Sequence, residues 1–132
     1  MPDGTSPTRS KPLVLLVDDF PDTLDLLADY LRWRGFEVLT AADGGAAVEM
    51  ARTHLPDAMI LDMQLPIFTG LEVARMLKAD PSTSDIQIIA FTANIYEYIM
   101  EEALAAGCSS YITKPTAPEE IEGQIWRVLA HA

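Results

Sequence analysis

Short apolar segments recur along the chain, and most of them are rich in Val, Ile and Leu. Apolar runs of this length, bounded by polar residues, are typical of strands whose two faces are both buried. The predicted strands are Leu13–Val17, Glu37–Ala41, Ala58–Leu61, Ile86–Phe91 and Ser110–Thr113.

The segments between these runs have apolar residues at the three- and four-residue spacing of amphipathic helices. Pro21 is suited to the first helical position, Gly35 to a helix end and Asp43 to the N-cap of the second helix. A capping box from Thr116 to Glu119 predicts the start of the fifth helix. The predicted inward-facing positions, helix by helix, are Leu24, Leu27, Ala28 and Leu31; Ala47, Val48 and Ala51; Leu71, Ala74 and Leu77; Ile95, Ile99, Ala103 and Ala106; and Ile121, Ile125, Val128 and Leu129.

The alternation of strands and helices predicts an α/β fold, a doubly wound five-stranded parallel sheet with helices on both faces and right-handed crossovers. In such sheets ligands bind at the carboxyl ends of the strands, where the strand order reverses. The residues that follow the predicted strands are therefore the candidates for chemistry.

Chemically versatile side chains follow four of the predicted strands. They are Asp18 and Asp19 after the first, Asp62 after the third, Thr92 after the fourth and Lys114 after the fifth. Each alone is explained by a turn, a helix cap or a solvated surface, but their joint placement at one sheet edge is improbable by chance. Carboxylates without Cys or His favour a hard cation, Mg²⁺ or Mn²⁺, and a hydroxyl and an ammonium suit phosphoryl oxygens. Because a carboxylate in this setting can accept a phosphoryl group, the pattern predicts phosphoryl transfer.

Composition and charge exclude several other classes of protein. A length of 132 residues, 49% of them hydrophobic, indicates one globular domain, and we expect a flexible tail over residues 1–12 and the domain over residues 13–132. The net charge of −11 argues against nucleic-acid binding, because phosphate backbones would be repelled. No apolar run approaches the roughly 20 residues of a membrane span, and the N-terminus lacks the apolar segment of a signal peptide. The single cysteine, Cys108, fits a cytoplasmic protein.

From about Leu13 to Leu129 the chain resembles the receiver domain of two-component response regulators, of the single-domain, chemotaxis-regulator-like kind. The resemblance implies a flavodoxin-like sheet with the strand order 2-1-3-4-5. Four motifs carry it, and together they are highly specific. They are Val17-Asp18-Asp19; Leu61-Asp62-Met63-Gln64-Leu65-Pro66 with Gly70; Phe91-Thr92-Ala93; and Gly107-Cys108-Ser109-Ser110-Tyr111-Ile112-Thr113-Lys114-Pro115.

The resemblance implies that Asp62 is the phosphoacceptor. A histidine kinase or a histidine phosphotransfer protein would present a phosphohistidine, which the Asp62 carboxylate attacks in the presence of Mg²⁺. Asp18, Asp19, Asp62 and the backbone carbonyl of Gln64 are the implied metal ligands. The protein would then be a phosphorylated signalling domain and not an enzyme with a separate substrate, since it catalyses only its own phosphorylation and autodephosphorylation.

The resemblance also implies a switch. Lys114 would pair with the phosphoryl group, and the Lys114–Pro115 peptide bond is expected to be cis. In the switch pair, the Thr92 hydroxyl would move onto the phosphoryl group and the Tyr111 ring would follow inward. These contacts would bias a two-state equilibrium in the face formed by the fourth helix, fifth strand and fifth helix. An unknown downstream protein would bind this face, and formation of a homodimer through it is also possible. The apolar segment Ile95–Met100 is either helix core or part of this output surface.

Other classes of function share parts of the pattern. A phosphohydrolase of the haloacid dehalogenase type needs Asp-x-Asp after the first strand and a cap domain, whereas Asp18 and Asp19 are adjacent and the chain is short. An FMN carrier needs a Ser/Thr/Gly-rich phosphate loop at the same place. A receiver fold that serves only as an unphosphorylated docking module is a third alternative, against which the intact acidic residues and lysine argue. No second domain follows the fifth helix, so we expect a stand-alone receiver or one cut from a longer protein.

Overall fold

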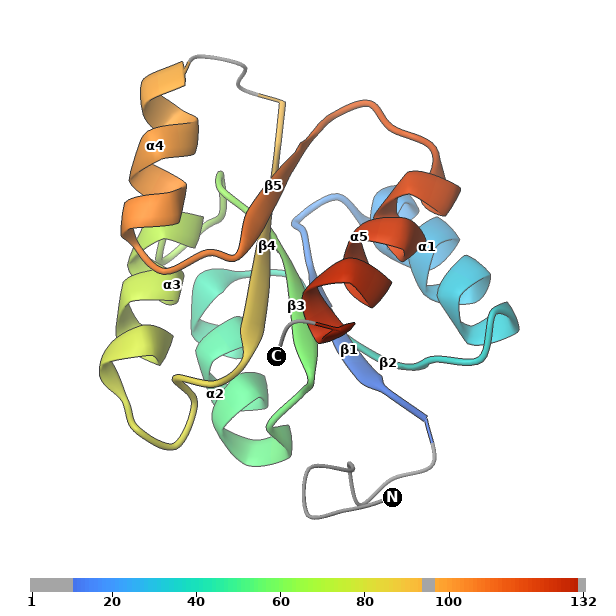
Figure 1. The fold of residues 1–132 in the computed structure, drawn as a ribbon, viewed down its shortest axis with the longest axis horizontal. Coiled ribbons are helices and arrows are strands. Elements are labelled where there is room, and N and C mark those ends of the chain that lie inside the picture. The colour runs from blue at the N-terminus through green and yellow to red at the C-terminus, as the bar shows by residue number, and fades with distance from the viewer. Residues whose placement is uncertain (1–10, 94–96, 131–132) are drawn as a thin grey trace.

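The computed structural model describes residues 11–93 and 97–130, in which strands and helices alternate (Figure 1). Of the tail predicted over residues 1–12, only Lys11 and Pro12 belong to the described part. The strands are β1 (Leu13–Val17), β2 (Glu37–Ala41), β3 (Ala58–Asp62), β4 (Gln87–Thr92) and β5 (Ser110–Thr113). The helices are α1 (Pro21–Trp33), α2 (Gly44–His54), α3 (Gly70–Ala79), α4 (Glu97–Ala105) and α5 (Pro118–Ala130).

The strands form one parallel sheet in the order β2-β1-β3-β4-β5. Helices α1 and α5 cover one face of the sheet, and α2, α3 and α4 cover the other (Figure 1). The predicted doubly wound, flavodoxin-like α/β fold is therefore confirmed. β2 is added on one side of β1, and β3, β4 and β5 are added on the other side, so the strand order reverses at β1. Sheets of this kind bind ligands at such a reversal, here in the crevice at the carboxyl ends of β1 and β3.

Three strand ends differ from the prediction by one residue. β4 begins at Gln87 instead of Ile86, and the other two differences concern candidate site residues. β3 extends to Asp62, which pairs with Phe91, and β4 extends to Thr92, which pairs with Thr113. The ladder continues because the Met63 N–H still donates to the Phe91 carbonyl, at 3.3 Å. Asp62 and Thr92 are thus held by the sheet itself rather than by the loops that follow it.

The core consists of two apolar layers, one on each face of the sheet. The central strands β1 and β3 are buried throughout, but the edge strand β5 is not: Ile112 is buried and Tyr111 is exposed. Within the described residues, no helix is both long and apolar enough to cross a bilayer. The predicted inward positions are buried, except that Leu71, Ile99 and Leu129 are half-buried and Ile95 lies outside the described residues.

Helix caps were predicted with mixed success. Asp43 caps α2 as expected, since its carboxylate accepts the Ala46 N–H at 2.7 Å. The prediction of a capping box at Thr116 is wrong. α5 begins at Pro118, so the N-cap position is that of Ala117 and not Thr116. A capping box instead precedes α3, where Thr69 occupies the N-cap.

Candidate functional site

The three aspartates predicted at the strand ends come together at the carboxyl edge of the sheet. Asp18 and Asp62 are buried, with 3% and 5% of their surface exposed, whereas Asp19 is exposed. One carboxylate oxygen from each of the three lies within 4.8 Å of the other two. The Asp18 carboxylate accepts the Phe20 N–H at 2.9 Å, and that of Asp62 accepts the Gln64 N–H at 3.0 Å. Backbone donors thus orient both buried carboxylates.

Lys114 reaches this cluster from the end of β5. Its Nζ donates to Asp18 Oδ2 at 2.7 Å and to Asp62 Oδ2 at 3.4 Å. Its backbone N–H donates to the Thr92 carbonyl at 2.8 Å, which fixes the end of β5 against β4. The Lys114–Pro115 peptide bond is cis.

Burial and charge act against one another in this cluster. Burial raises the pKa of the Asp62 carboxyl above its ordinary value, although the Gln64 N–H and the Lys114 ammonium act in the opposite direction. For Lys114, burial disfavours the charged form, but the hydrogen bond to Asp18 and the charges of both carboxylates raise its pKa overall. One ammonium faces three carboxylates, so the cluster retains an excess of negative charge.

This donor set fits a hard divalent cation. The three carboxylates offer oxygen ligands only, and two of them are buried with one oxygen oriented by a backbone N–H, which leaves the site pre-shaped for an ion such as Mg²⁺. Gln64 lies in the loop after β3 with its side chain exposed, and its N–H is engaged by Asp62.

The predicted switch residues lie on neighbouring strands but in different surroundings. Thr92, at the end of β4, is 2% exposed, whereas Tyr111 on β5 is 39% exposed. Tyr111 lies beside Ala90 in the register of β4 and β5. The structure thus places Tyr111 at the surface of the β5 edge, and strand alternation directs its side chain to the face opposite that of Ile112.

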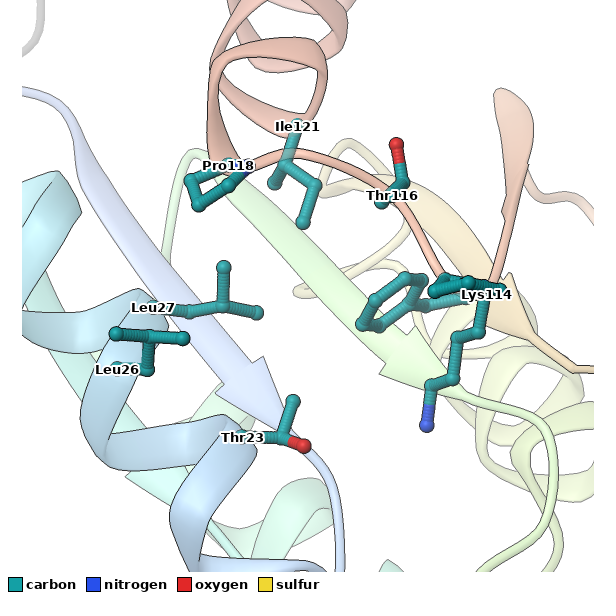
Figure 2. Close-up of a pocket in the computed structure, with 9 residues that line it drawn as sticks. Thr23, Leu26, Leu27, Lys114, Thr116, Pro118 and Ile121 are labelled. Carbon is teal, nitrogen blue, oxygen red and sulfur yellow. The ribbon is translucent and has the colours of Figure 1, made fainter.

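Sequence reasoning missed two features of the site. The Phe91 ring lies under the Lys114 ammonium, with Nζ 4.8 Å from the ring centroid. A groove of about 250 Å³ opens beside Lys114 between α1, which contributes Thr23 and Leu26, and the start of α5, which contributes Pro118 (Figure 2). Neither feature leaves a signal in the sequence. An apolar residue in β4 is expected in the core whether or not a lysine lies over it, and apolar residues on α1 do not indicate a groove.

The close approach of α3 to the site explains one glycine. A Cβ atom on Gly70 would lie 2.4 Å from the Asp62 carbonyl oxygen and 2.6 Å from the Met63 Cα. Only glycine allows α3 to begin so near the end of β3. The presence of a glycine eight residues after Asp62 is therefore explained by the packing of α3 against the end of β3.

Comparison with known proteins now identifies the family. The pattern of the response regulator receiver domain matches residues 14–125 of the chain. The chain belongs to this family. Receiver domains are signalling domains of two-component systems rather than classical enzymes, and this one carries the acidic pocket of Asp18, Asp19 and Asp62.

Relatives of known name agree with this assignment. The receiver domain is 36% identical over 110 residues to the polar-differentiation response regulator DivK of Brucella anthropi, a match that covers 83% of this chain and 89% of the relative. It superimposes with a TM-score of 0.85 and 28% identity on the chemotaxis response regulator CheY4 of Vibrio cholerae, covering 90% of this chain and 99% of that one.

A third relative carries a metal ion. The receiver domain of the sensor histidine kinase PA1611 from Pseudomonas aeruginosa has a TM-score of 0.84 and 31% identity to this receiver domain, over 92% of this chain and 99% of that one. Its crystal structure has a magnesium ion coordinated in the active-site cleft.

Proposed function

We propose that Asp62 is the phosphoacceptor and that it receives its phosphoryl group from a phosphohistidine on a histidine kinase or a histidine phosphotransfer protein. One observation carries the proposal: the buried Asp62 carboxylate lies in a cluster with two further carboxylates and the Lys114 ammonium. In the reaction, a bond forms between an Asp62 carboxylate oxygen and phosphorus while the bond from phosphorus to the histidine nitrogen breaks. The product is an acyl phosphate on Asp62 and an unphosphorylated histidine.

Asp18, Asp19 and Asp62, together with the Gln64 carbonyl, would hold the divalent cation. When bound, Mg²⁺ neutralises the carboxylates and the phosphoryl oxygens, which lowers the repulsion between an anionic nucleophile and an anionic donor. The all-oxygen donor set supports this assignment, as does the magnesium ion in the PA1611 receiver domain. Mn²⁺ satisfies the same ligands.

Lys114 and Thr92 are the proposed partners of the phosphoryl oxygens. The acyl phosphate adds up to about two negative charges beside an ammonium that already lies 3.4 Å from Asp62. The Thr92 hydroxyl, at the end of the neighbouring strand, would complete the contacts, and the exposed Tyr111 ring would move inward. Contacts made only after phosphorylation would thereby bias the face of α4, β5 and α5 toward a second conformation.

The partners follow from this proposal. The donor is a histidine kinase or phosphotransfer protein in the cytoplasm, and the output is a downstream protein that binds the face of α4, β5 and α5. A homodimer through this face is the other form of output. Leu26, which is exposed, lines the groove beside Lys114 and gives a protein donor an apolar contact next to the acceptor site.

Intact mass spectrometry after incubation with acetyl phosphate and Mg²⁺ tests the proposal. We expect the wild-type protein to gain one phosphoryl group and the Asp62→Asn variant to gain none. Asp25→Asn, which changes an exposed aspartate of α1, is the matched control and should gain the group normally. Full labelling of Asp62→Asn would refute the assignment of the acceptor.

The same preparation separates the rival functions. Continuous turnover of a small phosphate ester would favour a phosphohydrolase, and a yellow protein that releases FMN would favour a flavin carrier. A protein that never gains phosphate, with either small-molecule or protein donors, would favour the docking module.

A further inference from the structure

The aromatic ring of Phe91 lies between the core and the candidate site. Phe91 is 5% exposed, and its neighbours in the apolar layer include Leu27, Ile112 and Ile121. In the register of β3 and β4 it pairs with Asp62. Since paired residues of a parallel sheet point to the same face, the ring lies on the side of the sheet from which the Asp62 carboxylate projects.

The Lys114 ammonium lies over this ring, 4.8 Å from its centroid. A cation within about 6 Å of an aromatic ring face is attracted by the negative potential of that face, and the attraction is stronger where water is excluded. The lysine side chain is 25% exposed and the ring is buried, so this pair is largely shielded from water.

The two ion pairs of Lys114 favour Asp18 over Asp62. The ammonium is closer to Asp18, at 2.7 Å, than to Asp62, at 3.4 Å. A lysine side chain is flexible and its three donors have no preferred plane, so it would follow the stronger ion pair toward β1. The Phe91 ring is attached beside Asp62 and offers the ammonium a surface on that side.

We infer that Phe91 is a positioning residue whose ring face holds the Lys114 ammonium beside Asp62, where the phosphoryl oxygens arrive. The inference rests on the proposed function, since it assumes that Asp62 accepts the phosphoryl group. A ring that only filled the core would be replaced without functional loss by any apolar group of the same shape. A ring that positions a cation depends on its π-electrons.

Fluorinated phenylalanines at position 91 separate these two roles. One, two and three ring fluorines leave the shape nearly unchanged but progressively weaken the attraction of the ring face for a cation. With acetyl phosphate and Mg²⁺, the initial phosphorylation rate should fall stepwise, by about three- to tenfold at three fluorines. The melting temperature and the Mg²⁺ affinity should not change along the series.

Phe36 supplies the matched control. It is also a buried phenylalanine, 2% exposed, but its ring packs against Trp126, with centroids 4.9 Å apart. The same fluorinated series at position 36 should leave the phosphorylation rate unchanged. Equal rates along the series at position 91 in a protein that labels normally would overturn the inference.

A second measurement does not depend on phosphorylation. The ring current of Phe91 should shift the ε-methylene protons of Lys114 upfield in NMR spectra of lysine-labelled protein, and Phe91→Leu should abolish the shift. The order of the Lys114 side chain should fall along the fluorinated series. If the wild-type protein gains no phosphate but these signals behave as expected, the proposed function fails while the ring contact stands. If the signals do not respond, the ring does not hold Lys114.

Discussion

In the absence of divalent ions, replacing Lys114 by methionine should destabilise the protein. The same replacement should strengthen the binding of Mg²⁺. The Lys114 ammonium contacts two carboxylates whose side chains are only 4% and 8% exposed. Methionine keeps most of the length and the apolar stem of the side chain but removes the charge. Asp18 and Asp62 would then be two buried carboxylates without a cation between them.

The size of the loss follows from burial. Removing one partner of a fully buried ion pair costs about 3–5 kcal/mol. Lys114 is 25% exposed and each carboxylate keeps a backbone N–H donor, so the loss should be smaller, about 2 kcal/mol. For a domain of this length that corresponds to a fall of about 7 °C in melting temperature. Mg²⁺ should bind about tenfold tighter, since a competing positive charge has left the same oxygens.

Urea unfolding in the presence of a chelator and then of increasing Mg²⁺ measures both effects. Ligand that binds only the folded state raises the free energy of unfolding with concentration, so the midpoint reports the Mg²⁺ affinity. Trp126, which packs against the buried Phe36, provides the fluorescence signal. Lys78→Met is the control. It removes hydrogen bonds of 2.8 and 2.6 Å to the Ser84 and Ile86 carbonyls, so it should destabilise the protein without changing Mg²⁺ affinity.

Three results would refute this reasoning. A Lys114→Met protein as stable as the wild type without Mg²⁺ would mean that the carboxylates do not depend on the ammonium. Weaker Mg²⁺ binding in that variant would mean that Lys114 supports the cation site instead of competing with it. An equal gain in Mg²⁺ affinity for Lys78→Met would mean that net charge, and not position, determines the effect.

Three further expectations concern other parts of the chain. Ile67→Gly should raise the free energy of unfolding by about 1 kcal/mol in urea titrations. Ile67 is 72% exposed and has a φ of 73°, a backbone conformation that is unfavourable for β-branched residues. A lower urea midpoint for the variant would contradict this. Burial disfavours the charged form of Glu122, yet hydrogen bonds that include the Arg34 side chain lower its pKa overall. The stabilisation it contributes is therefore present above the unfolded-state pKa and is lost as the pH falls through the folded-state value, so below about pH 4.5 the wild type should lose stability more steeply than Glu122→Gln; parallel pH profiles would refute this. In receiver domains the residues two positions after the phosphoacceptor and two after the switch hydroxyl border the path of the hydrolytic water, and in this chain they are the neutral amides Gln64 and Asn94. Gln64→Ala and Asn94→Ala should therefore alter the rate of autodephosphorylation while leaving Mg²⁺ affinity nearly unchanged, and decay rates identical to that of the wild type would rule this out.

The sheet and the position of the acidic cluster were predictable because both depend on local patterns. A polar residue directly after an apolar run lies at the end of a strand, and parallel strands bring such ends to one edge. This reasoning located Asp18, Asp62 and Lys114 from the sequence alone, and the structure brings them within hydrogen-bonding distance. It did not place the strand ends to the residue, since the extension of β3 through Asp62 depends on pairing with β4.

Features that depend on the path of the chain were not predictable. Thr-x-x-Glu occurs both at Thr69 and at Thr116, and only the first is a capping box, because α5 begins at Pro118. The sequence pattern is the same in both places, and the direction in which the chain enters the helix decides between them. The contact between Phe91 and Lys114 also requires the register of β4 against β3 and the course of a long side chain, neither of which leaves a pattern in the sequence.

The geometry suggests how a local reaction would reach a distant surface. Lys114 and Tyr111 belong to the same short segment at the sheet edge, and the Lys114 N–H is tied to the Thr92 carbonyl. The Lys114 ammonium contacts both carboxylates, at 2.7 Å from Asp18 and 3.4 Å from Asp62, so an acyl phosphate on Asp62 would strengthen the second contact at the expense of the first. Because the backbone of Lys114 is held by β4, such a shift would be taken up by the side chain and by the neighbouring Thr92. β4 and β5 then connect the phosphoryl group to the exposed Tyr111 ring within one pair of strands, and the apolar layers of the core need not rearrange.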